Sequence, residues 1–420
     1  MQTKTTMLWL LAYTVLIVES TSAAPTLAAL APQPIQTEFR LSNQCPPSFE
    51  KSATGGCELR TLYEFYDSVQ DRGVGGLQTS LPTHRDSFTP EQIDLGRYLF
   101  FDPVLSADGT ISCASCHQPG KGFGDGLPTS VGIGGQAVTR AAPTLWNVAF
   151  LDTFFWDARA RSLEEQAQGP LYAAHEMGNT PGGMLNALNG IDTYRALFSL
   201  AYERNDQELI SLDEVYLALA AFQASLISLN SRYDRYVHGY HEALTPNEIE
   251  GMNIFRSFVA RCSECHMPPL FTTGQIAVIG APEPEGRPLD VGAEKTFDTP
   301  RLKAGFKVPT LRNIGVTAPY MHSGLFDNLR DNVAFYNGGR GHAVPPGVDL
   351  ELHWHISSPD LREDELDRLV DFLHTLTDES LKPKTPETLP SGLPLVHITP
   401  AASSQSPRAA QLLKHKIYQE

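Results

Sequence analysis

The chain has 420 residues, which is long enough for two or three domains. Hydrophobic residues make up 41% and charged residues 19%, an ordinary composition for a soluble protein. The formal net charge of −16 argues against nucleic acid or an anionic membrane surface as a partner, and it allows a basic protein partner.

The N-terminal residues predict a secretory signal peptide over residues 1–23. Lys4 supplies a positive charge, an apolar run follows from Met7 to Val18, and Thr21-Ser22-Ala23 has the small residues of a cleavage site. The apolar run is too short to span a bilayer, and no later stretch is long and apolar enough to do so. We therefore expect no membrane span in the mature protein.

Residues 24–85 are rich in Pro, Ser, Thr and Gly and are predicted to form an N-terminal extension. Two of the six cysteines, Cys45 and Cys57, lie in this extension. In an oxidising compartment they are expected to form a local disulfide, and two free thiols are the alternative.

Two helices are predicted from the same start signal. The segment Thr89–Gln92 places threonine at the N-cap, proline at the first helical position and glutamine three residues after the cap, which together make a capping box. The segment Thr245–Glu248 repeats the pattern with glutamate. Apolar residues at helical spacing follow each segment, and each predicted helix leads into a C-x-x-C-H sequence.

The C-x-x-C-H sequence occurs twice, at Cys113–His117 and at Cys262–His266. It is the attachment signal for c-type haem, because two thiols one helical turn apart can form thioethers to the vinyl groups and the histidine can bind the iron. A zinc ribbon would bring its two cysteine pairs within about 15–20 residues, which is far closer than these pairs lie. Two covalent haems c are therefore expected on Cys113, Cys116, His117, Cys262, Cys265 and His266.

The segments that follow the two motifs are also alike. Pro143–Asn147 parallels Pro309–Asn313, and this alignment places Trp156 opposite His322. Each repeat closes on a predicted amphipathic helix, the first over about 211–236 and the second over about 360–377.

These features predict an all-α fold, with two cytochrome c-like haem domains in tandem, irregular loops and the N-terminal extension. The first domain is placed at 86–240 and the second at 241–378. Residues 379–420 are rich in Pro and Ser and are expected to form a flexible C-terminal tail.

The same alignment predicts that the two irons differ. Pro170, on the distal stretch of the first repeat, has no side chain that can bind iron. Tyr336 stands at the matching place of the second repeat, and its phenolate can bind ferric haem. We expect an open first haem and a six-coordinate second haem.

Residues 86–378 resemble the bacterial di-haem cytochrome c peroxidase family, which includes MauG-like enzymes. The resemblance rests on both haem motifs and on stretches in the family's order and spacing. These are Ala142–Thr144, Phe155–Arg159, Leu163–Gln166, Gly169–Pro170, Glu176–Gly178 and Val308–His322.

The resemblance implies roles for several residues. The haem on His117 corresponds to the peroxidatic haem, and Gln166, Pro170 and Glu176 match its distal pocket. Glu176 can shuttle the proton that peroxide must move before its O–O bond breaks. Trp156 matches a tryptophan between the two haems, where it can relay electrons. The family also implies a periplasmic location.

Two departures from the conventional peroxidases favour the MauG-like branch. Ile133 stands where those enzymes carry a histidine that caps the peroxidatic iron, so the first haem should be five-coordinate without prior reduction. Tyr336 stands where they carry methionine, and Met321 is the competing ligand of the second iron. A phenolate stabilises ferric iron, so the second haem should have a low reduction potential.

A third departure concerns calcium, which the family holds between its domains. Thr317 and Pro319 match the positions of two backbone carbonyl ligands, but Ala141 stands where the family has an asparagine side chain. Calcium is tolerant in its coordination geometry, so its binding is left open.

The expected function is a periplasmic enzyme that reduces hydrogen peroxide at the His117 haem, while the second haem relays electrons. The electrons come from a small cytochrome c, a cupredoxin or a side chain of a protein substrate. The sequence leaves a homodimer open. The alternative is a di-haem electron carrier without peroxide chemistry, in which protein ligands fill both irons.

Overall fold

The computed structural model describes residues 39–65, 81–205, 207–339 and 341–396. They belong to one compact unit that begins at Phe39. The predicted signal peptide over 1–23 lies outside the described residues, as do residues 24–38 and 66–80 of the extension and residues 397–420 of the tail.

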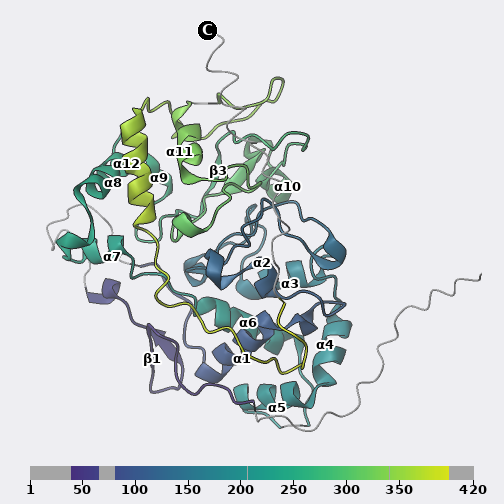
Figure 1. The fold of residues 1–420 in the computed structure, drawn as a ribbon. Coiled ribbons are helices and arrows are strands. Elements are labelled where there is room, and N and C mark those ends of the chain that lie inside the picture. Colours follow the sequence, from purple (N-terminus) through teal and green to yellow (C-terminus); the bar gives the residue numbers. More distant parts are fainter. Residues whose placement is uncertain (1–38, 66–80, 206, 340, 397–420) are drawn as a thin grey trace, which may run out of the picture. The chain divides into compact units, whose positions relative to one another are not determined.

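The described chain is rich in helix and poor in strand (Figure 1). The first half contains α1 (Pro90–Phe101), α2 (Cys113–Cys116), α3 (Leu163–Tyr172), α4 (Pro181–Asn189), α5 (Asp192–Ala201), α6 (Leu212–Ala224) and α7 (Arg232–Val237). The second half contains α8 (Pro246–Arg256), α9 (Cys262–Cys265), α10 (Ala293–Phe297), α11 (Leu329–Asn337) and α12 (Glu363–His374).

Two small antiparallel sheets complete the described fold. One pairs β1 (Phe49–Lys51) with β2 (Cys57–Leu59), and the other pairs β3 (Ile276–Val278) with β4 (Gly305–Lys307). In the second sheet Ala277 lies opposite Phe306. The expectation of a helix-rich fold is confirmed, with short 3-10 turns in the connections.

The predicted helix starts are present at α1 and α8. The backbone N–H of Gln92 donates to Thr89 Oγ1 at 3.2 Å, and the N–H of Thr89 donates back to Gln92 Oε1 at 3.1 Å. Thr245 and Glu248 make the same reciprocal pair, at 3.4 and 2.8 Å. Each box satisfies two of the N–H groups that a helix start leaves without a partner.

Two separate hydrophobic cores form around two helix pairs. Helix α1 packs against α6 in the first core, and α8 packs against α12 in the second (Figure 1). Both contacts depend on a glycine that lets the helices approach closely. A Cβ added at Gly96 would lie 1.9 Å from the carbonyl oxygen of Ala218, and one added at Gly251 would lie 1.9 Å from that of Arg368.

A pair of asparagines ties the two halves to each other. Asn147 and Asn313 both have left-handed backbone conformations, with φ of 62° and 61°. The Asn147 side chain donates to the carbonyl of Ser228 and accepts from its N–H, both at 2.9 Å. The Asn313 side chain donates to Ser228 Oγ at 2.7 Å. Both repeats therefore bind the same serine.

These bonds correct the predicted helix over 211–236. Helix α6 ends at Ala224, and the next residues form an extended segment before α7 begins at Arg232. In this segment the backbone groups of Leu226 and Ser228 form hydrogen bonds with Asn147 instead of helical ones. A tertiary partner thus outcompetes the local helical pattern.

The predicted flexible tail over 379–420 needs a correction for its first part. Residues 379–396 run from α12 back to the first helix pair, as the yellow trace in Figure 1 shows. Leu389 is buried in the first core, and the hydroxyl of Ser391 donates to Asp102 Oδ1 at 2.7 Å. Apolar side chains among the prolines and serines hold this segment in place.

The N-terminal extension is also anchored where it is described. Cys45 and Cys57 form the expected disulfide. The hydroxyl of Tyr63 donates to the carboxylate of Asp234. Asp234 is buried and precedes the second haem motif in the sequence. The extension thereby contributes a hydrogen bond to the interior of the second half.

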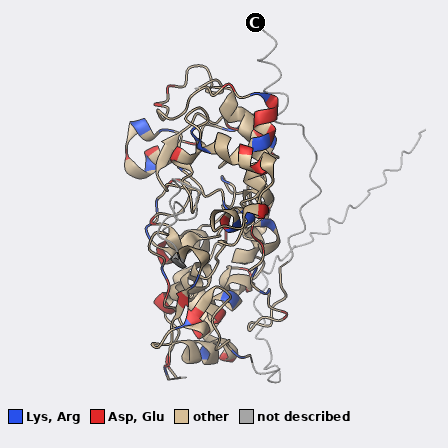
Figure 2. Cartoon of the chain, turned by 90° about the vertical axis from the view of Figure 1, so that its left-hand side faces the viewer, with Lys and Arg blue, Asp and Glu red and all other residues tan. Residues whose placement is uncertain are grey.

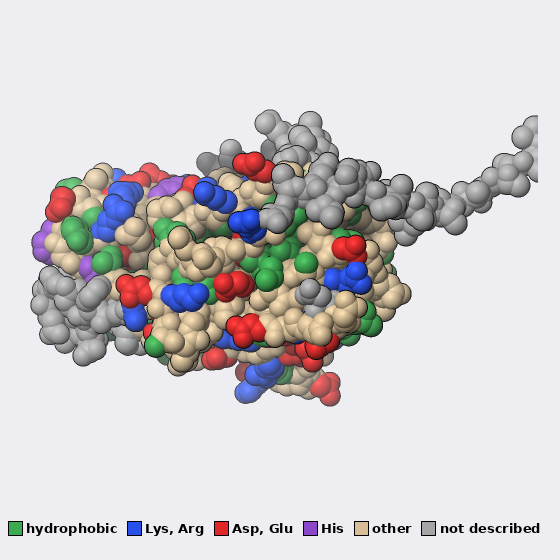
Figure 3. Space-filling model, turned by 90° about the horizontal axis from the view of Figure 1, so that it is seen from below, with side chains coloured by type: hydrophobic (Ala, Val, Ile, Leu, Met, Phe, Trp, Pro, Cys, Tyr) green, Lys and Arg blue, Asp and Glu red, His purple; other side chains and the backbone are tan. Residues whose placement is uncertain are grey.

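Charged and apolar residues are interspersed in the described part of the chain. Figure 2 shows acidic and basic residues interspersed, and the face in Figure 3 carries small groups of hydrophobic side chains among charged ones. Within the described ranges, no helix has the length and apolar character needed to cross a membrane.

The close approach at Gly96 gives a stability prediction. Gly96→Ala should lower the free energy of unfolding by about 3 kcal/mol or more, because the new methyl group must displace the backbone of α6. Gly182→Ala in α4 is the control, since nothing lies within 4 Å of its added Cβ. Urea denaturation of both variants measures the difference, and equal stability of the two would contradict the packing.

Candidate active site

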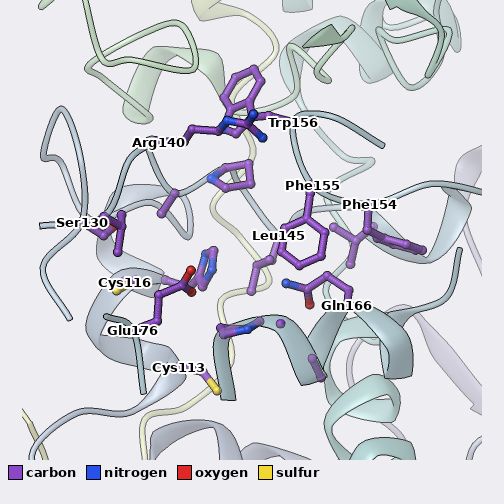
Figure 4. A pocket seen from close by; sticks show the side chains of 18 of the residues that line it. Cys113, Cys116, Ser130, Arg140, Leu145, Phe154, Phe155, Trp156, Gln166 and Glu176 are labelled. Carbon is purple, nitrogen blue, oxygen red and sulfur yellow. The ribbon is translucent and has the colours of Figure 1, made fainter. Parts of the chain in front are cut away.

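A cavity of about 360 Å³ lies over the first C-x-x-C-H motif. It gathers residues from α2, α3 and the loops between them, as Figure 4 shows. The site residues predicted for the first repeat all line it: Cys113, Cys116, His117, Trp156, Gln166, Pro170 and Glu176. Residues far apart in sequence therefore meet in one space that is large enough for a ligand.

The thiols and the imidazole of this motif fit covalent haem. Cys113 and Cys116 form no disulfide, and burial raises the pKa of both thiols to about 12. The Nδ1–H of His117 donates to the carbonyl of Phe123 at 2.8 Å, and burial lowers the pKa of the ring. The neutral ring therefore keeps Nε2 with a free lone pair, which is the form that binds iron.

Helix α3 supplies another part of the cavity wall. Ser162 caps the helix by accepting the N–H of Glu165 at 3.1 Å, which fixes the turn that carries Gln166. Pro170 sits inside the helix. A Cβ added at Gly169 would lie 2.7 Å from Phe155, so glycine is needed for the ring to reach the cavity wall.

Glu176 approaches the same cavity from a short loop after α3. Its N–H donates to the carbonyl of Ala173 at 2.9 Å, and its own carbonyl accepts the N–H of Ile133 at 2.8 Å. Burial raises the pKa of this carboxyl above its ordinary value, while His175 and Arg159 oppose the shift. Gln166 and Glu176 reach into the space from two sides in Figure 4.

Trp156 lies at the contact of the two halves. Its Nε1–H donates to the carbonyl of Ala141 at 2.9 Å, and its own carbonyl accepts the N–H of Lys307 at 2.7 Å. Its ring meets His322 edge to face, with centroids 6.4 Å apart. The two residues that the internal alignment placed opposite each other are therefore in contact.

The second C-x-x-C-H motif has the same imidazole arrangement. His266 Nδ1 lies 3.2 Å from the carbonyl of Phe271 and 3.1 Å from that of Pro309. Burial lowers the pKa of this ring to about 4, so it is neutral and offers Nε2. Cys262 and Cys265 form no disulfide.

Tyr336 on α11 lies close enough to both thiols of this motif to interact with them electrostatically. Burial raises the pKa of the Tyr336 phenol, and Cys262 and Cys265 raise it further. Met321 is half-buried and packs in the same hydrophobic core. Both candidate ligands of the second iron are therefore in the second half of the chain, beside the motif they were predicted to serve.

Comparisons with known proteins agree with this arrangement. A model of the family described as di-haem cytochrome c peroxidase matches residues 90–242. The cytochrome c551 peroxidase of Pseudomonas aeruginosa is 31% identical over 331 residues, which cover 76% of this chain and 85% of that protein. The methylamine utilization protein MauG of Methylorubrum extorquens is 35% identical over 291 residues, which cover 69% and 79%.

The chain belongs to the di-haem cytochrome c peroxidase family.

Solved structures show the same relationship. A MauG-like protein associated with microbial copper homeostasis superposes with a TM-score of 0.66 at 31% identity, covering 74% of this chain and 99% of that one. The di-haem peroxidase BthA of Burkholderia thailandensis gives 0.62 at 28% identity, covering 74% and 91%. The protein is thus an oxidoreductase of the di-haem peroxidase type, and its family implies haem c as the cofactor.

The structure shows the surroundings of the residues that depart from the conventional peroxidases. Ile133 is not among the residues that line the cavity, and its side chain packs beside Gly178. Thr317 and Pro319 accept no hydrogen bond at their carbonyls from any described residue. The carbonyl of Ala141 already accepts the indole N–H of Trp156. Calcium binding stays a prediction, with two free carbonyls and no asparagine side chain.

Sequence reasoning missed a buried ion pair beside the second motif. Arg312 and Asp234 are both fully buried and joined by two bonds of 2.6 and 2.8 Å. Arg312 also donates to the carbonyl of Pro269, just after the motif, at 2.8 Å. The available signal was the internal alignment, in which an arginine replaces Trp146 of the first repeat.

Sequence reasoning considered His353 and His355 as a pair and missed only their closeness to Cys265. His353 and His355 bring ring nitrogens close to its sulfur, in a group whose atoms lie within 4.8 Å of one another. His355 Nε2 also lies 3.0 Å from a carboxylate oxygen of Glu264. A thioether to haem would occupy this sulfur, so the cluster borders the second motif and does not form a separate metal site.

The buried pair of Arg312 and Asp234 should contribute more to stability than an ion pair on the surface. Burial opposes ionisation of Asp234, but Arg312 outweighs it and holds the pKa of the carboxyl below its ordinary value. Asp234→Asn should cost about 3–5 kcal/mol, because it leaves the arginine charge buried without a partner. The double variant Asp234→Asn/Arg312→Met should lose less than the single one.

The matched control is Glu363→Gln, which removes an exposed partner of Arg330. This variant should change stability little, since water screens the pair. Thermal unfolding at neutral pH compares the three variants. Equal losses for Asp234→Asn and Glu363→Gln would contradict the role given to burial.

Proposed function

We propose that the protein reduces hydrogen peroxide at a five-coordinate haem on His117, and that a second haem on His266 relays electrons in a MauG-like manner. The observation that carries the proposal is the cavity over the first motif, which His117, the amide of Gln166 and the carboxyl of Glu176 line together. A haem bound there supplies the redox chemistry, and the described side chains supply orientation and proton transfer.

Two side chains handle the peroxide. Glu176 takes a proton from one peroxide oxygen and returns it to the other, and burial brings its pKa nearer to neutrality for this task. Gln166 holds the bound peroxide through its amide. Pro170 presents no atom that can bind iron, so it would leave an iron held by His117 accessible to peroxide.

Trp156 is the electron relay between the two centres. It lines the cavity of the first motif, and its ring and backbone contact His322 and Lys307 of the second half. An aromatic ring at this junction shortens the distance over which an electron must move. Tyr336 would hold the iron of the second haem, and Met321 is the alternative.

The MauG-like assignment rests on Ile133 and Tyr336. An apolar residue at position 133 leaves the first iron uncapped in the resting enzyme, so no reductive activation is needed. A phenolate on the second iron lowers its potential, which suits sharing oxidising equivalents between the two irons better than receiving electrons from a high-potential cytochrome. A small cytochrome c or a cupredoxin is the donor under the conventional peroxidase alternative.

The remaining parts of the proposal concern organisation. The two haem domains span 86–240 and 241–378, and the signal peptide directs the protein to the periplasm. The proposed calcium site uses the backbone carbonyls of Thr317 and Pro319. A di-haem electron carrier is the second candidate function, and it requires protein ligands on both irons.

Glu176 gives the most direct test. Glu176→Gln should lower kcat/KM for hydrogen peroxide by about 10²–10⁴-fold, because it removes the proton-transfer group. The wild type should lose activity as the pH falls through the pKa of Glu176, which lies above the ordinary 4.5, and the variant should lack this acid limb. Glu208→Gln, at an exposed position, is the control. Unchanged turnover in Glu176→Gln would refute the role of this residue.

Tyr336 tests the second centre. Tyr336→Phe should shift the reduction equilibrium of the second haem toward ferrous iron by on the order of tenfold or more, because the phenolate is lost. Spectroelectrochemistry follows the change, and Tyr240→Phe, at an exposed tyrosine, serves as the control. An unaltered potential and spectrum in Tyr336→Phe would assign the ligand to Met321 instead.

A further inference from the structure

Lys307 belongs to the second half of the chain but reaches the cavity of the first. It is the last residue of β4, and it lines both the cavity over His117 and a second pocket that Met267 and Leu270 border. Its backbone N–H donates to the carbonyl of Trp156 at 2.7 Å. The strand that meets the relay tryptophan therefore brings Lys307 to the wall of the first cavity.

The ammonium of Lys307 has no hydrogen bond or ion pair with any residue that the structure describes. Burial alone lowers its pKa, to about 8, and no neighbouring charge contributes. The other cations of the cavity wall are paired. Arg140 binds Asp157 at 2.8 Å and Asp290 at 2.7 Å, and Arg159 binds Asp157 at 2.8 Å.

The carboxyl of Glu176, which also lines the cavity, is not the partner of Lys307. The carboxyl of Glu176 interacts with His175 and Arg159 and not with Lys307. Figure 4 shows Glu176 away from Trp156, whose backbone binds Lys307. The cavity therefore has an acidic side for proton transfer and, near Trp156, a cation that lacks its anion.

A buried charge without a partner is costly, so native proteins pair such groups. The proposed cofactor brings anions of its own, because haem carries two propionate carboxylates. We propose that Lys307 pairs with a propionate of the haem on His117. This inference rests on the proposed function only in requiring haem at that motif.

The pairing makes Lys307 a positioning residue. It places a positive charge beside the first haem, which favours its reduced form, and it ties that haem to the backbone segment that holds Trp156. Loading of the first haem would then also fasten β4 of the second half to the cavity wall. The relay tryptophan and the haem edge are held by a single residue.

The test compares Lys307→Met, Lys307→Gln and Lys307→Arg in the two-haem protein, with Lys295→Met on α10 as an exposed control. Redox titration followed by EPR, without peroxide, reports the potential of the high-spin haem. Loss of the charge should shift its equilibrium toward ferric iron by at least about tenfold, or about 59 mV for one electron. Lys307→Arg and Lys295→Met should stay within about threefold of the wild type.

The pairing would be overturned if the reduction equilibrium of the first haem in Lys307→Met and Lys307→Gln stayed within about threefold of the wild type, with both haems present. If neither variant retains the His117 haem, Lys307→Arg decides. Retention of that haem in Lys307→Arg supports the need for a positive charge, and its loss refutes the pairing. A wild type that binds both haems but does not turn over peroxide would refute the proposed function and leave this test intact.

Discussion

The hydrogen bond from His117 Nδ1 to the carbonyl of Phe123 is the constraint on which the site depends. It uses one ring nitrogen, and burial keeps the ring neutral, so the other nitrogen is the only one left to bind a metal. His266 repeats the arrangement with two carbonyls. The protein thus fixes the proximal side of both centres in the same way and leaves the distal sides to differ.

The duplication explains how the two centres can share a frame and diverge in chemistry. The capped helices, the close glycine contacts and the left-handed asparagines recur in both halves. The distal helices α3 and α11 begin at matching leucines, Leu163 and Leu329. On this common frame, we propose that Pro170 leaves one distal side without a protein ligand and that Tyr336 supplies a phenol to the other. Under this proposal, the difference between Pro170 and Tyr336 would separate a ligand-binding centre from a closed one.

Much of this could be predicted from sequence because its signals are local. The capping boxes of α1 and α8, the two C-x-x-C-H motifs and the internal alignment each lie within a short stretch. The end of α6 at Ala224 could not be predicted, since a distant asparagine decides it.

The same limit applies to three other features. The pair of Arg312 with Asp234, the packing of Leu389 in the first core and the reach of Lys307 into the first cavity all join segments far apart in the chain. Only the fold brings these residues together, so no local pattern reports them.

The central claim is that one iron is open and the other is closed by protein. An EPR spectrum of the fully oxidised, resting protein tests it most directly, because it counts the two spin states at once. The account predicts one high-spin ferric haem and one low-spin ferric haem in equal amounts. Two low-spin signals, with a protein ligand over the His117 haem, would contradict it.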